Sequence, residues 1–140
     1  MVAGSLLLGA CGASYSGTTL SAQVSSWASS TGFTGAVNQL QGDLRRVKGY
    51  PSAPGSSWKA DCDVLVTDAL DTNQNLPSPD QQLTDLLASA YSAAGDAGHG
   101  CFEGVRGAGL VRFTTERTTA VRELIKSLAR YDALTTGTAP

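Results

Sequence analysis

The sequence predicts an all-α protein, an antiparallel helical bundle of four arms, and three observations support this fold class. Apolar residues recur at intervals of three and four over most of residues 20–134, the spacing of one face of a helix. A helix-capping sequence, "LPSPDQQL", separates the two central arms. The alternating pattern of a strand extends no further than "VLV" at residues 64–66. A chain of 140 residues is long enough for one domain with a hydrophobic core.

The first arm combines two apolar stripes. Leu20, Val24 and Trp27 predict a short helix. Gly32 separates this helix from a longer stripe, so the first arm is either two helices or one helix kinked at Gly32. The longer stripe consists of Phe33, Val37, Leu40, Leu44 and Val47.

The second and third arms each carry a cysteine on the apolar stripe. The stripes consist of Trp58, Cys62, Leu65 and Ala69 in the second arm, and of Leu83, Leu87, Ala90, Ala94, Ala97 and Cys101 in the third. We expect Ser78 to cap the third arm and Pro79, which has no N–H, to be its first helical residue. Asp80 favours the positive end of the helix, and Gln81 completes a capping box.

The final arm is predicted within residues 113–134, with Thr114 or Thr115 as its cap and its end before Gly137. The glycine-rich segment "AGHGCFEGVRGAG", residues 97–109, predicts a flexible connection from Cys101 to this helix. The apolar stripe of the final arm consists of Val121, Leu124, Leu128 and Tyr131, with Ile125 beside them.

Charge is unevenly distributed although the net charge is only -2. Residues 33–50 hold one acidic and three basic residues, residues 56–97 seven and one, and residues 98–140 four and six. No segment has the concentrated basic charge of a nucleic-acid-binding surface, so we expect no nucleic-acid partner. Arg122, Lys126 and Arg130 form a basic stripe on the final helix. We expect it to pair with the acidic middle hairpin or, as the functional alternative, to contact anionic lipid or cell-wall polymer.

The N-terminal residues resemble the signal segment of a bacterial lipoprotein. Residues 1–10 are apolar or small and shorter than the about 20 residues that span a bilayer. Leu8-Gly9-Ala10-Cys11 resembles a lipobox, which implies that Cys11 becomes the first mature residue and carries a diacylglyceryl anchor. The residues that follow Cys11, from Gly12 to Thr19, are rich in glycine, serine and threonine, which is typical of a flexible tether. The alternative is an ordinary apolar helix with Cys11 as a buried thiol.

The lipoprotein resemblance also assigns the other two cysteines. Lipidation at Cys11 implies an oxidising compartment, where an unpaired exposed thiol is a liability. We therefore expect one interhelical disulfide between Cys62, near the start of its helix, and Cys101, at the end of the next; the alternative is two separate buried thiols. The expected organisation is a truncated signal segment over 1–10, a tether over 11–19, a helical bundle over 20–134 and a disordered tail over 135–140.

Residues with catalytic or ligand chemistry are few. His99 is the only histidine and lies beside Cys101, but a disulfide removes the thiolate, so we expect a surface histidine at a fraying helix end. The glycines near it lack the GKS or GKT of a phosphate loop, and the aspartates of residues 61–71 lack the glycine and distal glutamate of a calcium loop. We expect no catalytic residue, no metal and no cofactor.

Residues 20–132 also resemble a broad group of small exported helical proteins of actinobacteria, with a tryptophan in the first helix, "LPSPD" at a turn and a cysteine in each middle helix. This resemblance implies a fold and no activity. The resulting hypothesis is a non-enzymatic domain, lipid-anchored on the extracytoplasmic face of the cell membrane, that engages a protein or another envelope component. The alternatives are a carrier of a small apolar ligand and a phage or prophage lipoprotein that excludes superinfection.

Overall fold

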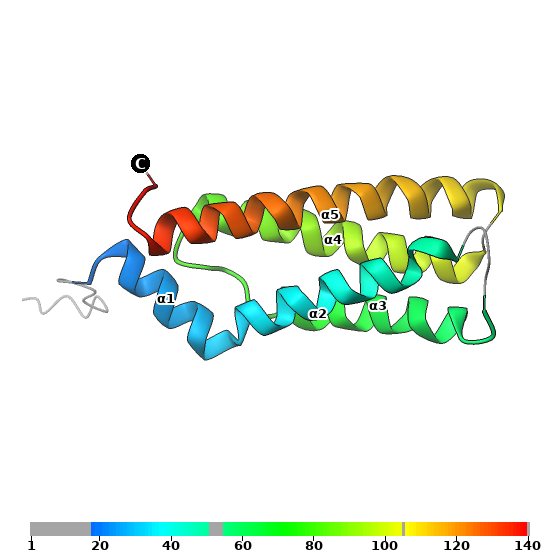
Figure 1. The fold of residues 1–140 in the computed structure, drawn as a ribbon, viewed down its shortest axis with the longest axis horizontal. Coiled ribbons are helices and arrows are strands. Elements are labelled where there is room, and N and C mark those ends of the chain that lie inside the picture. The colour runs from blue at the N-terminus through cyan, green and yellow to red at the C-terminus, as the bar shows by residue number, and fades with distance from the viewer. Residues whose placement is uncertain (1–17, 51–54, 105, 140) are drawn as a thin grey trace, which may run out of the picture.

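The computed structural model describes residues 18–50, 55–104 and 106–139, and over these residues the protein is helical without strands. The prediction of an all-α fold is therefore confirmed. Helices α2, α3, α4 and α5 run alternately in opposite directions along the long axis, and α1 extends the first arm at one end (Figure 1). The helices are α1 (Leu20–Thr31), α2 (Phe33–Arg46), α3 (Trp58–Asn73), α4 (Gln81–Glu103) and α5 (Gly107–Thr135), with a 3-10 turn η1 (Val47–Gly49) after α2.

Gly32 divides the first arm into two helices. Its φ of 66° lies in the left-handed region that glycine adopts without steric penalty, and its N–H donates to the Ala28 carbonyl at the end of α1. Of the two forms that the sequence leaves open, the structure therefore has the two-helix form. The stripe of α2 and η1 is buried as predicted, whereas Leu20 is 42% exposed.

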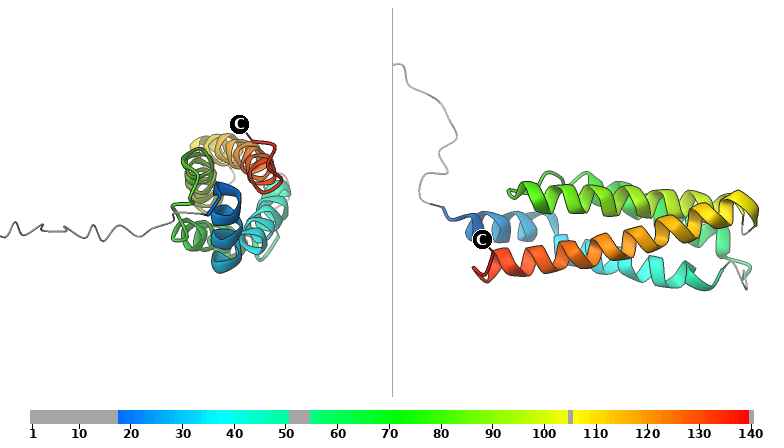
Figure 2. Two further views of the ribbon diagram at one scale, coloured as in Figure 1. Left: turned by 90° about the vertical axis from the view of Figure 1, so that its left-hand side faces the viewer. Right: turned by 90° about the horizontal axis from the view of Figure 1, so that it is seen from above.

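The four arms surround one core, which the end-on view makes visible (Figure 2). In this view α2 lies between α3 and α5, and α4 closes the ring on the other side. Aromatic rings join the first arm to α5, because the Phe33 ring lies 5.1 Å from that of Trp27 and 5.0 Å from that of Tyr131. The bulk of the core is aliphatic and includes Leu40, Leu44, Leu65, Leu83, Leu87 and Leu124.

Helix α4 begins at Gln81, later than the predicted start at Pro79, and its cap is Asp80 instead of Ser78. The Asp80 carboxylate accepts a hydrogen bond from the Leu83 N–H at 2.7 Å, and its backbone is extended, as an N-cap requires. The Ser78 hydroxyl donates to the Asp80 carbonyl at 2.7 Å. Gln81 donates to a side chain within α4, so the predicted capping box does not form.

Helix α5 begins at Gly107, before the predicted caps Thr114 and Thr115, which lie inside the helix. Most of the segment expected to be a flexible connection is helical, because α4 continues past Cys101 to Glu103. A Cβ on Gly100 would lie 2.9 Å from the Phe113 nitrogen, and one on Gly109 would lie 2.8 Å from the Gly104 carbonyl oxygen. These two glycines therefore allow a close approach of backbones between α4 and α5.

The residues after α5 fold back on its C-terminal end. The N–H groups of Thr138 and Ala139 both donate to the Ala133 carbonyl at 2.9 Å, and Ala139 packs against the core. These two hydrogen bonds satisfy a carbonyl that the end of a helix otherwise leaves free. The disordered tail expected over residues 135–140 stays a prediction, and its last residue lies outside the described residues.

Candidate functional site

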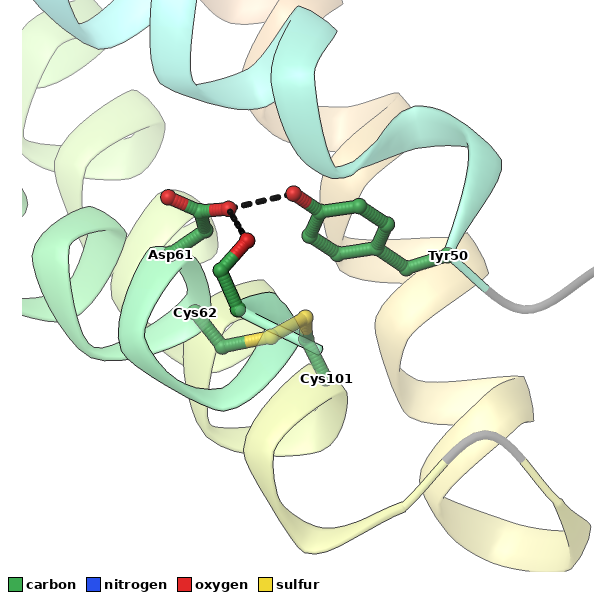
Figure 3. Close-up of a disulfide and its surroundings, with 5 residues drawn as sticks. Tyr50, Asp61, Cys62 and Cys101 are labelled. Atoms are coloured by element: carbon green, nitrogen blue, oxygen red, sulfur yellow. Dashed lines mark hydrogen bonds between the residues drawn. A yellow bond between two sulfur atoms is a disulfide. The ribbon is translucent and has the colours of Figure 1, made fainter. Parts of the chain in front are cut away.

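The Cys62–Cys101 disulfide joins α3 to α4, so this prediction is confirmed (Figure 3). Both cysteines are buried, and their Cα atoms lie 5.7 Å apart. Next to the disulfide, the Tyr50 hydroxyl donates to the Asp61 carboxylate, which also accepts from Ser57 at 3.2 Å (Figure 3). The bond to Asp61, aided by burial, raises the pKa of Tyr50 above its ordinary value. The disulfide thus links α3 to α4, and the Tyr50–Asp61 hydrogen bond links the end of η1 to α3.

His99 is exposed within α4 and not at a fraying end, because the helix continues to Glu103. It lines a groove of about 290 Å³ between α3 and α4, together with Asp96 and the buried Tyr91. The Asp96 carboxylate accepts from Arg112 of α5 at 2.9 Å and so acts as an interhelical ion-pair partner. Within the described parts of the chain, no group of three or more His, Cys, Asp or Glu side chains could hold a metal ion.

Arg130 belongs to the interior of the bundle, although the sequence places it on one stripe with Arg122 and Lys126. Its guanidinium donates two hydrogen bonds to the Asp80 carboxylate, at 3.1 Å from Nε and 2.8 Å from Nη2. The two side chains are only 16% and 9% exposed. The guanidinium holds the pKa of the Asp80 carboxyl below its ordinary value, since it stabilises the ionised form. Arg130 therefore pairs with the acidic hairpin and is not part of an exposed basic surface.

Arg122 and Lys126 share one acceptor. Both donate to Oε1 of Glu123, at 2.9 Å and 3.1 Å, and these bonds hold the pKa of Glu123 below its ordinary value. The two cationic side chains nevertheless stay 56% and 54% exposed. Glu123 thus fixes a pair of cations at the surface of α5.

Aliphatic side chains lie between these two cations and Arg117. Ile125 is 59% exposed, in contrast to its expected place beside the buried stripe, and Val121 is half-buried next to it. Arg117 closes the other side, where its Nε donates to the Leu44 carbonyl of α2 at 2.8 Å. Partial burial lowers the pKa of Arg117, yet a guanidinium stays charged in proteins. These side chains line a shallow depression of about 370 Å³, formed by Arg117, Thr118, Val121, Arg122, Ile125 and Lys126.

We call the three cations that line the depression, Arg117, Arg122 and Lys126, the basic α2–α5 surface, because Arg117 also bonds to α2. Helices α2 and α5 are neighbours in the bundle (Figure 2). Most aspartates lie on α3 and α4 instead, on the other side. Arg45, Arg46 and Lys48 are further exposed cations of α2 and η1.

A second groove, of about 570 Å³, lies between α1 and residues 77–79. Trp27 forms part of it, while its indole N–H donates to the Asn75 carbonyl at 3.0 Å. The groove is open at the surface, and no charged side chain lines it. The other residues that line it are Thr18, Ala22, Gln23, Ser26, Ser30, Pro77, Ser78 and Pro79.

Cys11, the predicted lipidation site, lies outside the described residues. Among the helices from α1 to α5, none is both long and apolar enough to cross a membrane. Comparisons of the chain with family models, with curated proteins and with solved structures found no match.

Proposed function

We propose that the protein is a non-enzymatic, lipid-anchored domain on the extracytoplasmic face of the cell membrane, and that its basic α2–α5 surface contacts anionic lipid of that membrane. The observation that carries this proposal is the exposed Ile125 in the depression that Arg117, Arg122 and Lys126 also line. An aliphatic side chain among cations is complementary to a lipid interface, which offers anionic headgroups beside acyl chains.

The free energy that the basic α2–α5 surface can contribute to membrane binding is small, so we expect this surface to act together with a lipid anchor. Each Lys or Arg near an anionic bilayer contributes about 1 kcal/mol, so a few bases alone give weak binding. A diacylglyceryl group at Cys11 would hold the domain at the membrane and raise its effective concentration there. The Cys62–Cys101 disulfide supports the extracytoplasmic location, because such bonds persist in oxidising compartments.

The arrangement of the cations suits a flat partner. Arg117 and Lys126 lie on one helix, about 14 Å apart along its axis at 1.5 Å per residue. Arg122 lies between them, and the depression that they line is shallow. A side-on orientation of α5 would bring Ile125 to the membrane surface with cations on both sides of it.

Vesicle binding tests the contact with lipid. The full chain with Cys11→Ser, which has no lipid, should cosediment with vesicles that contain phosphatidylglycerol and much less with phosphatidylcholine vesicles. Arg122→Gln with Lys126→Gln should weaken this binding about tenfold or more, since two charges of about 1 kcal/mol each are removed. Lys59→Gln, a matched change on α3, should leave it unaltered.

Two outcomes of the vesicle experiment would contradict the proposal. Equal binding to both kinds of vesicle would exclude an electrostatic contact. Binding of an anionic cell-wall polymer but of no vesicle would assign the surface to the polymer. The anchor is tested separately, by the intact mass of protein from the membrane fraction: a chain that begins at Cys11 and carries a diacylglyceryl group is expected.

A further inference from the structure

Asp43 is a fully buried carboxylate on α2. Its Oδ1 accepts from Arg46 at 2.9 Å and, at the limit of hydrogen-bonding distance, from Gln39 at 3.5 Å. Its Oδ2 is buried without a hydrogen-bond partner in the described part of the chain. Buried polar atoms in native proteins almost always have a partner, so this oxygen calls for an explanation.

The neighbour of Asp43 on α3 is Asp68, whose carboxyl is one of the groups that raise the pKa of Asp43. Two ionised carboxylates at this interface repel each other, whereas one shared proton converts the repulsion into an O–H···O hydrogen bond. Burial, and next to it the Asp68 carboxyl, raise the pKa of Asp43 to about 6, and Arg46 opposes this rise. On the side of α5, Arg117 donates to the Leu44 carbonyl of α2.

We propose that Asp43 and Asp68 form a proton-binding site at the α2–α3 interface, which takes up a proton in mildly acidic medium and thereby frees part of the charge of Arg46. The proton comes from solvent and is released to solvent, and no other bond forms or breaks. This inference is independent of the proposed function.

Arg46 is the exposed side of the proton-binding site. Its side chain is 47% exposed, while Nη1 is held by the buried Asp43 carboxylate. Protonation of the Asp43–Asp68 pair removes one negative charge beside this cation.

The raised pKa of Asp43 determines the direction in which the stability of the folded protein should change with pH. Because the pKa of Asp43 is raised in the folded protein, the folded state binds the proton more tightly than the unfolded state does. The resulting stabilisation is present at pH values near 4 and is lost as the pH rises through about 6. The α2–α3 interface should thus be tighter in acid than at neutral pH.

Thermal unfolding of the full, unlipidated chain tests the proton-binding site. The Tm should fall by about 5 °C between pH 5 and pH 7.5. Asp43→Asn keeps the shape of the side chain but has no charge, so its Tm should be higher than that of the wild type at pH 7.5 and nearly constant over this range. Asp63→Asn, an exposed change on the same helix as Asp68, should retain the wild-type profile.

A wild-type profile that is flat, or one that Asp43→Asn does not alter, would overturn the inference. If Asp43→Asn does not fold, the carboxyl carbon of Asp43 in the wild-type protein is titrated by NMR. A midpoint near 6 supports the site, and a midpoint below about 4.5 excludes it, since that is the range of ordinary aspartates.

Discussion

Arg130 of α5 and Asp80 form a bidentate ion pair, with distances of 2.8 and 3.1 Å, and the same carboxylate caps α4 through the Leu83 N–H. One side chain therefore fixes the start of a helix and its attachment to the neighbouring helix. This double role explains why Asp80 and not Ser78 is the cap: the carboxylate offers two oxygens, and both are used.

Arg130→Met should destabilise the protein by about 2 kcal/mol, because it leaves a mostly buried carboxylate with fewer partners. The pKa of Asp80 is lowered in the folded state, so this stabilisation is present above the ordinary carboxyl pKa and is lost as the pH falls through the folded value. Urea unfolding should therefore show a constant difference between variant and wild type from pH 6 to 8 and a smaller one below pH 4. Arg112→Met, which breaks exposed ion pairs on the same helix, should cause a clearly smaller loss. Equal losses for both would contradict the special role of Arg130.

Removal of the disulfide should lower stability. Cys62 and Cys101 are 39 residues apart in sequence, and the chain-entropy estimate for a loop of this length is about 4 kcal/mol. Cys62→Ala with Cys101→Ala, or reduction of the wild type, should shift the urea midpoint downward accordingly. Cys11→Ser should leave the midpoint unchanged. An unchanged midpoint after complete reduction would show that the bond does not constrain the unfolded chain.

Gly98 and Gly95 of α4 differ in the space that a larger side chain would have, so alanine substitutions at the two positions can be compared. A Cβ on Gly98 would lie 2.6 Å from Cγ2 of Val66 and 3.0 Å from the Cys62 carbonyl oxygen, whereas one on Gly95 would lie 3.9 Å from Ala69. Gly98→Ala should destabilise by about 1–3 kcal/mol, because α3 and α4 must separate. Gly95→Ala should be neutral or stabilising by up to about 1 kcal/mol, since alanine favours the helix. Thermal unfolding measures both, and the same effect at both positions would contradict the close packing at Gly98.

Glu123 should limit the affinity of the basic α2–α5 surface. Its carboxylate neutralises part of the charge of Arg122 and Lys126. Glu123→Gln preserves the shape of the side chain and removes the charge, so binding to phosphatidylglycerol vesicles should strengthen about fivefold, which corresponds to about 1 kcal/mol. Glu103→Gln, an exposed change at the end of α4, should have no effect. Unchanged affinity of Glu123→Gln would place the contact elsewhere.

The sequence predicts the helices well where one apolar stripe decides the structure. The stripe from Phe33 to Val47 is buried throughout, and both cysteines face the core as expected. Prediction from the sequence fails where residues that are distant in sequence determine where a helix begins. The cap of α4 depends on Arg130, which is 50 residues away, and the start of α5 depends on backbone packing at Gly100 and Gly109. Local patterns treat those glycines as a flexible loop, because the helix that covers them is not visible in the sequence.

The candidate site was only partly accessible from the sequence for the same reason. Arg122 and Lys126 are exposed as an amphipathic helix predicts, but helical spacing cannot distinguish them from Arg130, whose partner lies at the start of α4. Arg117 joins the surface through a carbonyl of α2, a contact that depends on which helices are neighbours. Asp43 looks like one more polar residue of α2, and only its complete burial reveals the proton-binding site.

The covalent link between α3 and α4 also changes what a protease can do to this molecule. The connection between these helices, residues 74–80, includes the exposed Gln74. Cleavage there would divide the peptide chain between Cys62 and Cys101, yet the sulfur bridge would still join the two fragments. A clipped domain would thus remain attached to its N-terminal segment, and its release would require a reductant as well as the cut.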